Sequence, residues 1–326
     1  MKAVPGVLRG CWLLAALPLP MAGATAITGP VAGYVPQSPG PVLRAILGVP
    51  GSFRFSDPLA LPPGVAKIYV APQQDFAIVE REAAGVAVLS FATGTVGSVT
   101  PLDGAVTPDW VTFSMQSGSA VLFSAASNRL QVFTGLPASP RKVADVDAGL
   151  FGEMPRSAAV SDDGGTVLMA GRRSVYSVQP NGAARELLEA NAIASLALFR
   201  NGTSAAIWDG GAGSVHVLDN VSTKPSDRVV ATGWKGGGKL YPSWDGGTVF
   251  LVRPGTKFVA ALDLASGDVN CFSTGVAAMT LEPLRNRDTF LISAGRRQPA
   301  WIFYFDGSTG RTVFVPASSP SPEDVP

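Results

Sequence analysis

Residues Gly233–Leu240, with the sequence GWKGGGKL, place two glycines and a lysine at the spacing of a phosphate-binding loop. In such a loop the backbone N–H groups hold the phosphates, and a serine or threonine after the lysine binds Mg²⁺ at the start of a helix. Here Leu240 takes that position, and Tyr241–Ser243 leads into a predicted strand. The motif therefore predicts a flexible loop between structural units, and no cofactor is expected.

His216 is the only histidine of the chain, and it alternates with Val215 and Val217 as a strand residue would. A Ser–His–Asp relay would need a serine and an acid beside it, supplied across neighbouring structural units. A single histidine also excludes a metal centre built from several histidines. The pattern favours a histidine packed in a strand, so no catalytic residue and no metal ligand are predicted. Asp162, Asp163 and Asp245 lie in glycine-containing turns, which is ordinary turn chemistry.

Two basic turns, Gly171–Ser174 and Gly295–Gln298, suggest a binding surface, because guanidinium groups suit carboxylate, sulfate or phosphate. Three aromatic residues near loops that join structural units would add stacking surface, or else would cap the inner strands as core. The alternative for the arginines is that they are solvated turn residues. The candidate ligand-binding set is Arg172, Arg173, Arg296, Arg297, Trp110, Phe151 and Trp234.

The elements that position these residues repeat along the chain. A polar turn followed by a β-branched run occurs at 161–168 (SDDGGTVL) and again at 243–250 (SWDGGTVF). When weaker copies of this turn are included, the mean spacing from one copy to the next is about 42 residues, which is within the range of four-stranded propeller blades. A second landmark, a strand that ends in a glycine- or asparagine-containing turn, occurs seven times, the first copy lying in residues 32–40.

Each unit has room for four short strands, and a sheet with two apolar faces must be covered on both sides. We therefore predict an all-β fold, a β-propeller of seven blades of four-stranded antiparallel sheets, with six blades as the alternative. The N-terminal hairpin, residues 31–50, is expected to join the ring next to the last repeat and close it. Residues 183–190 have helical propensity, but the repeat register assigns them to the outer strand of a blade.

The turns at Asp163–Val167 and Asp245–Val249 resemble the secreted bacterial YVTN/WD40-like β-propeller repeats. The resemblance covers roughly residues 30–317 and implies one propeller domain; such propellers serve as scaffolds, ligand binders and occasionally enzymes. Gln74, Ser117 and Arg287 depart from the Asp–Gly turn in three units, and no unit carries the full Gly-His and Trp-Asp pair of WD40 repeats.

Residues 1–26 have the order of a secretory signal peptide: the cations Lys2 and Arg9, an apolar run, and small residues with cleavage expected after Ala24 or Ala26. The mature protein would be periplasmic or secreted, with no transmembrane segment. It would retain only Cys271 and so no internal disulfide. The Pro- and Ser-rich tail, residues 318–326, is predicted to be disordered.

The composition limits the partners. The chain has 326 residues, 25 Lys and Arg against 24 Asp and Glu, so no overall field favours nucleic acid. We expect an exported, monomeric, non-catalytic propeller that binds a protein, glycan or small anion on one face. The alternatives are a metal-dependent propeller enzyme of the lactonase or lyase type and a structural envelope component.

Overall fold

The structure is a computed structural model that describes residues 29–37, 40–179, 181–293 and 299–317. The predicted signal peptide (1–26), Arg296, Arg297 and the tail (318–326) lie outside the described residues. None of the described helices is long and apolar enough to cross a membrane.

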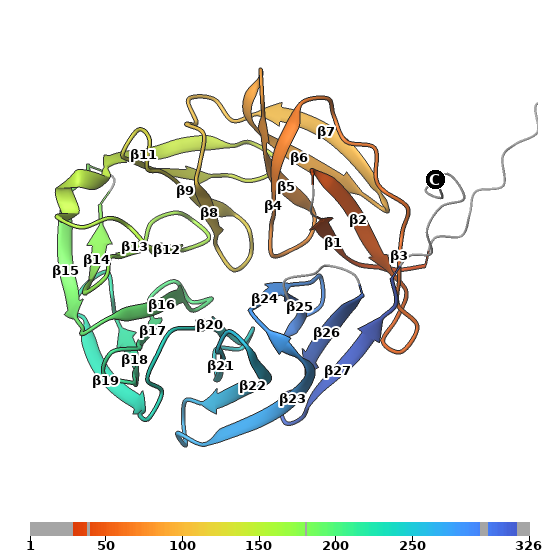
Figure 1. Cartoon of the computed structure of the whole chain (residues 1–326). Coiled ribbons are helices and arrows are strands. Elements are labelled where there is room, and N and C mark those ends of the chain that lie inside the picture. The colour runs from red at the N-terminus through yellow and green to blue at the C-terminus, as the bar shows by residue number, and fades with distance from the viewer. Residues whose placement is uncertain (1–28, 38–39, 180, 294–298, 318–326) are drawn as a thin grey trace, which may run out of the picture.

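Seven antiparallel sheets stand side by side in a ring, and each is built from one continuous stretch of chain (Figure 1). The chain is a seven-bladed β-propeller. The first four blades are β1 (Val31–Gln37), β2 (Val42–Leu47) and β3 (Arg54–Phe55); β4 (Val65–Val70), β5 (Phe76–Arg81), β6 (Gly85–Ala92) and β7 (Thr95–Pro101); β8 (Trp110–Phe113), β9 (Ser119–Ser124), β10 (Arg129–Thr134) and β11 (Arg141–Asp147); β12 (Ser157–Val160), β13 (Val167–Ala170), β14 (Ser174–Val178) and β15 (Ala184–Glu189).

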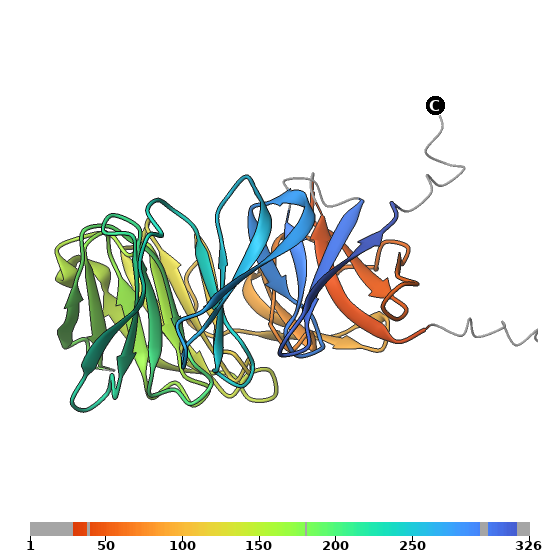
Figure 2. The same ribbon diagram turned by 90° about the horizontal axis from the view of Figure 1, so that it is seen from below.

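The remaining blades follow the same order, with the first strand nearest the axis and the last at the rim (Figure 1). They are β16 (Ile193–Leu198), β17 (Ala205–Asp209), β18 (Ser214–Asp219) and β19 (Ser226–Ala231); β20 (Lys239–Pro242), β21 (Thr248–Val252), β22 (Thr256–Asp263) and β23 (Val269–Ala278); β24 (Thr280–Pro283), β25 (Thr289–Ser293), β26 (Ala300–Phe305) and β27 (Gly310–Val315). Viewed edge-on, the strands run between two faces that carry the turns (Figure 2).

The predicted seven blades are confirmed and the six-blade alternative is wrong, but blade 1 has three strands instead of four. As predicted, the N-terminal hairpin joins the ring next to the last repeat, where it forms blade 1 between blades 7 and 2. After β3, the chain stays beside β2 through backbone hydrogen bonds from Ser56 N to Ala45 O and from Leu59 N to Leu43 O, both 2.8 Å. Ser56 also accepts a hydrogen bond from Ala45 N through its hydroxyl and one from the Arg44 side chain through its carbonyl. Prolines at 58, 62 and 63 lack the N–H donor that a fourth strand would need.

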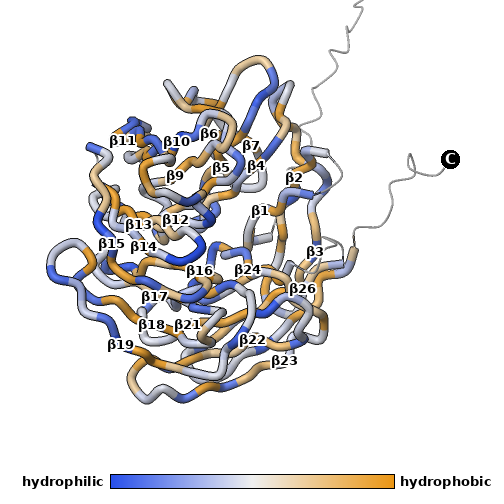
Figure 3. The backbone as a smooth tube through the Cα atoms, turned by 60° about the vertical axis from the view of Figure 1, so that its left-hand side comes forward, coloured by the Kyte–Doolittle hydropathy of each residue, from blue (hydrophilic) through white to orange (hydrophobic). Residues whose placement is uncertain are grey.

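The ring therefore closes by packing between complete sheets. One buried cluster joins Ala32, Val35 and Ile46 of blade 1 to Leu291 and Ile302 of blade 7. A second joins blade 1 to blade 2. Similar clusters fill the other seams, with hydrophobic stretches along the strands and hydrophilic ones in the turns between them (Figure 3).

The repeated Asp–Gly turns have a clear local cause. The Asp163 carboxylate accepts from Ser161 Oγ at 2.6 Å and from Gly165 N at 2.9 Å, while Gly164 takes a φ of +72°. Asp245 accepts from Ser243 and Gly247 at the same two distances. In blades 2 and 3, Gln74 and Ser117 adopt φ values of +60° and +65°, so the turn is kept without glycine.

The segment with helical propensity is strand β15, at the rim of blade 4, as its repeat register predicted. Leu187 and Leu188 pack against the cluster that joins blades 4 and 5, and this burial outweighs propensity. The described residues contain one helix, the 3₁₀ turn η1 (Ala148–Phe151).

Candidate functional site

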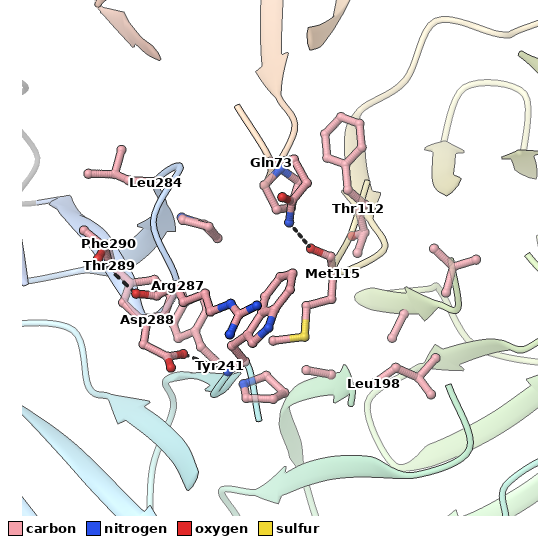
Figure 4. Close-up of a pocket in the computed structure, with 18 of the residues that line it drawn as sticks. Gln73, Thr112, Met115, Leu198, Tyr241, Leu284, Arg287, Asp288, Thr289 and Phe290 are labelled. Atoms are coloured by element: carbon pink, nitrogen blue, oxygen red, sulfur yellow. Dashed lines mark hydrogen bonds between the residues drawn. The ribbon is translucent and has the colours of Figure 1, made fainter. Parts of the chain in front are cut away.

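A cavity of about 420 Å³ lies on the axis, lined by residues of blades 2 to 7. It opens on the face where the inner strand of each blade turns into the second strand, since turn residues such as Gln73, Met115 and Trp244 line it. Figure 4 shows Arg287 entering the pocket from blade 7 and Met115 entering from blade 3. The cavity is therefore built from side chains that are distant in the sequence.

The inner part of the cavity is mainly apolar. Ala159, Val160 and Leu198 come from inner strands or their ends, and Phe113 adds an aromatic ring. The Tyr241 hydroxyl accepts from Leu281 N at 3.0 Å, and burial raises the pKa of this phenol, so the hydroxyl is neutral. Such a wall suits the apolar body of a ligand and offers few polar groups to orient it.

Trp244, at the mouth of the cavity, contacts one arginine from each neighbouring blade: Arg287, which also lines the cavity, and Arg200, which lies outside its lining. The guanidinium carbon of Arg200 lies 4.4 Å from the ring centroid of Trp244, and that of Arg287 lies 5.1 Å from it. These distances are within the range of cation–π attraction. Arg287 lines the cavity and is exposed, so its N–H groups can reach a ligand at the opening. Arg200 is exposed and donates from Nη2 to Gln116 Oε1 at 3.4 Å.

Asp288 holds the backbone of Trp244 in place through a hydrogen bond. Its Oδ1 accepts from the backbone N–H of Trp244 at 2.8 Å. Burial raises the pKa of Asp288, a shift that the Trp244 N–H and Arg287 oppose and that Asp245 reinforces. Among the described residues, the charged groups that line the cavity are Arg285, Arg287 and Asp288, an excess of positive charge.

The predicted basic turn lies on the opposite face, because the second-to-third strand turn is at the other end of the strands. Arg172 and Arg173 are exposed there. The backbone N–H groups of Arg172 and Ser174 donate to the Glu153 carboxylate at 2.7 and 3.2 Å. The amides of this turn thus hold a carboxylate of the same chain, while the guanidinium groups face solvent.

The three predicted aromatic residues are packed against blade cores. Trp110 stacks on Phe123 with ring centroids 5.1 Å apart. Phe151 is only 4% exposed, so it offers little stacking surface. Trp234 is half-buried, and its carbonyl accepts from Trp208 Nε1 at 2.7 Å. The structure does not bring these rings together with Arg172 and Arg173 into one site.

The loop Gly233–Gly238 continues into strand β20 and not into a helix, as expected. The described residues contain no group of three or more His, Cys, Asp or Glu that could hold a metal ion.

Sequence reasoning missed the residues at and beside the mouth. Arg200, Trp244 and Arg287 all lie in the turn that defines the repeat, in blades 5, 6 and 7. The recurrence of cations and an aromatic residue in this turn could have pointed to these residues. The recurrence alone does not show that the turns of three blades come together.

His216 lies on strand β18, as predicted, but its surroundings differ from the expectation. Its Nε2 lies 2.8 Å from Ser214 Oγ, and its Nδ1 lies 3.0 Å from each carboxylate oxygen of Asp227. The serine and the acid come from the same blade as His216, whereas the relay considered from the sequence would have drawn them from neighbouring blades.

No family model matches the chain, and no curated protein matches it significantly. Solved structures of similar fold do exist. A putative 6-phosphogluconolactonase from Bacteroides fragilis superposes with a TM-score of 0.57 at 14% identity, over 87% of this chain and 92% of that one. A protein from Lactobacillus plantarum gives a TM-score of 0.56 at 13% identity, over 88% of this chain and 96% of that one. PorZ, a surface component of the type-IX secretion system of Porphyromonas gingivalis, gives a TM-score of 0.56 at 16% identity, over 91% of this chain and 39% of that one. At these identities the likeness is one of fold.

Proposed function

We propose that this protein is a ligand-binding propeller whose central cavity takes a small molecule with an anionic group and an apolar body. The observation that carries the proposal is the contact between Arg287 and Trp244 at the cavity mouth, with Arg200 against the same ring. A guanidinium group stacked on a ring keeps its in-plane N–H donors available to a carboxylate, sulfonate or phosphate.

The size and charge of the cavity support this choice among the partner classes expected from the sequence. Its volume of about 420 Å³ falls within the range of small-molecule sites. The apolar inner wall would hold the body of the ligand, while Arg285 and Arg287 outweigh Asp288 in charge at the lining.

The test is a thermal-shift screen of benzenesulfonate, indole-3-acetate, 6-phosphogluconate and inorganic phosphate, followed by calorimetric titration of the best binder. Arg287→Ala and Trp244→Ala should each weaken binding by roughly tenfold or more, the scale of one charge-assisted hydrogen bond. The matched control is Arg172→Ala with Arg173→Ala, which removes two exposed arginines on the opposite face. Equal losses in the control and the mouth variants, or no loss in the mouth variants, would refute the proposal.

We also propose that residues 1–26 direct export to the periplasm or the medium, as their charge and hydropathy order indicates. Fractionation of cells that express the chain with and without this segment tests the proposal. The exported form should begin at Thr25 or Ile27. Retention of the full chain in the cytoplasm would contradict it.

A further inference from the structure

Blade 5 aligns a serine, an imidazole and a carboxylate in one hydrogen-bonded series. Ser214 and His216 are alternate residues of β18 and point to the same side of the sheet, while Asp227 lies on β19 next to them (Figure 1 shows the two strands). The Oγ–Nε2 distance is 2.8 Å, and both Nδ1–carboxylate distances are 3.0 Å. None of the three residues lines the central cavity.

The contacts define the direction of the hydrogen bonds for the neutral imidazole. An ionised carboxylate only accepts, so Nδ1 carries the hydrogen and donates it to Asp227. Nε2 then has a lone pair and accepts the hydroxyl proton of Ser214. This is the order of roles in a Ser–His–Asp relay, in which the acid orients the base and the base activates the serine.

Blade 4 provides an internal comparison. Ser174 begins β14 as Ser214 begins β18, and the two serines are equally exposed, at 9%. The Ser174 hydroxyl donates directly to Glu186 on the outer strand at 2.7 Å, and Tyr176 is at the position that corresponds to His216. A serine can therefore pair with a rim carboxylate without any imidazole, and blade 5 differs by placing a base between the two.

The hydrogen-bonded series runs toward the rim of the ring, beside the seam between blades 4 and 5. Leu218, on the same side of β18 as His216, packs in the cluster that joins these blades. Side-chain exposure rises from 14% at His216 to 37% at Asp227. Val229, the cross-strand partner of His216, is 54% exposed and supplies an apolar surface beside the imidazole.

The geometry points to a second, hydrolytic site at Ser214, with His216 as its general base and Asp227 as a positioning residue, acting on small esters with a short apolar group. Ser214 Oγ forms a bond to the ester carbonyl carbon, and its proton passes to His216 Nε2. The bond to the leaving alkoxide breaks as His216 returns that proton, which leaves an acyl-serine and an alcohol. Water, deprotonated by His216, then releases the carboxylic acid and restores the serine.

The test uses an alkyl fluorophosphonate on the folded protein, with mass spectrometry to locate the modified residue. The serine oxygen bonds to phosphorus, fluoride leaves, and the hydroxyl proton is taken up by His216. We expect modification of Ser214 and none of the equally exposed Ser174. His216→Gln should slow the reaction by on the order of a hundredfold or more, the scale of general-base catalysis. Labelling of both serines, of neither, or at an unchanged rate in His216→Gln would overturn the assignment.

A second pair of variants distinguishes the proposed catalytic role of the hydrogen-bonded series from a purely structural one. Asp227→Asn should slow labelling while thermal unfolding stays cooperative, and Asp227→Glu should restore part of the rate. Hydrolysis of p-nitrophenyl acetate by the same variants should follow the labelling rates, and Ser174→Ala should leave both unchanged. If Asp227→Asn changes stability but not the labelling rate, the series is structural. The result does not depend on ligand binding in the central cavity.

Discussion

The side-chain amide of Gln74 donates to the carbonyl of Pro283 at 2.6 Å and so ties blade 2 to blade 7. The same side chain accepts from the backbone N–H of Tyr34 in blade 1 at 2.6 Å, and it is 3% exposed. One buried residue therefore connects three blades at the point where the two ends of the chain meet. Among the described residues no strand is exchanged between blades, so such contacts, with apolar packing, hold the ring closed.

Replacing Gln74 with Ala should destabilise the protein by on the order of 2–4 kcal/mol, because the Tyr34 N–H and the Pro283 carbonyl would be left buried without their partner. The backbone cost of the positive φ is the same in both proteins, since alanine also has a Cβ. Urea unfolding measures the loss. Gln73→Ala is the matched control, since Gln73 makes a weaker 3.2 Å contact with the Met115 carbonyl; equal losses in the two variants would contradict the closure role.

Gly238→Ala should destabilise by about 1–3 kcal/mol, the usual cost of overpacking. A Cβ at this residue would lie 2.5 Å from the Val252 carbonyl oxygen and would press into the buried ring of Trp208. Gly237→Ala meets nothing within 4 Å and should be close to neutral. Unfolding curves of both variants test whether close packing requires a glycine at position 238. A neutral Gly238→Ala would contradict this requirement.

Stability should fall in acid partly through the Asp–Gly turns. The Ser161 hydroxyl and the Gly165 N–H lower the pKa of Asp163, and Ser243 and Gly247 lower that of Asp245. A carboxylate whose pKa is lower in the folded state stabilises it above the unfolded pKa of about 3.9 and loses this effect as the pH falls further. Asp163→Asn with Asp245→Asn should therefore show a shallower decline of unfolding free energy below about pH 4. A parallel decline in both proteins would contradict this assignment.

Anion binding at the central cavity should tighten as the pH falls. Burial raises the pKa of Asp288, so this carboxyl takes up a proton earlier than an exposed aspartate, and the mouth then becomes more positive. The measurement is titration with benzenesulfonate, whose own charge does not change in this range. Asp288→Asn should bind tightly at all pH values; a variant with the pH dependence of the wild type would exclude Asp288 as its source.

Much of the fold was predictable because each blade is a series of local hairpins. The turn at Ser161–Thr166, the outer strand at 184–189 and the seven repeats depend on neighbouring residues, whose types are visible in the sequence. The three-stranded blade 1 was not predicted, because its short third strand and the prolines after it fall outside the repeat.

The candidate sites depend on distances that a repeat pattern does not contain. Arg200, Trp244 and Arg287 meet because ring curvature brings equivalent turns of three blades together, although 44 and 43 residues separate them along the chain, about one blade length. Ser214, His216 and Asp227 meet because the pairing of β18 with β19 places an acid beside the imidazole. The sequence by itself determined an all-β chain of seven units and the turns within them, since these follow from local propensity and hydrophobic alternation. Only the tertiary structure decided which side chains share a cavity or a hydrogen bond, because closure of the ring and strand register set those contacts.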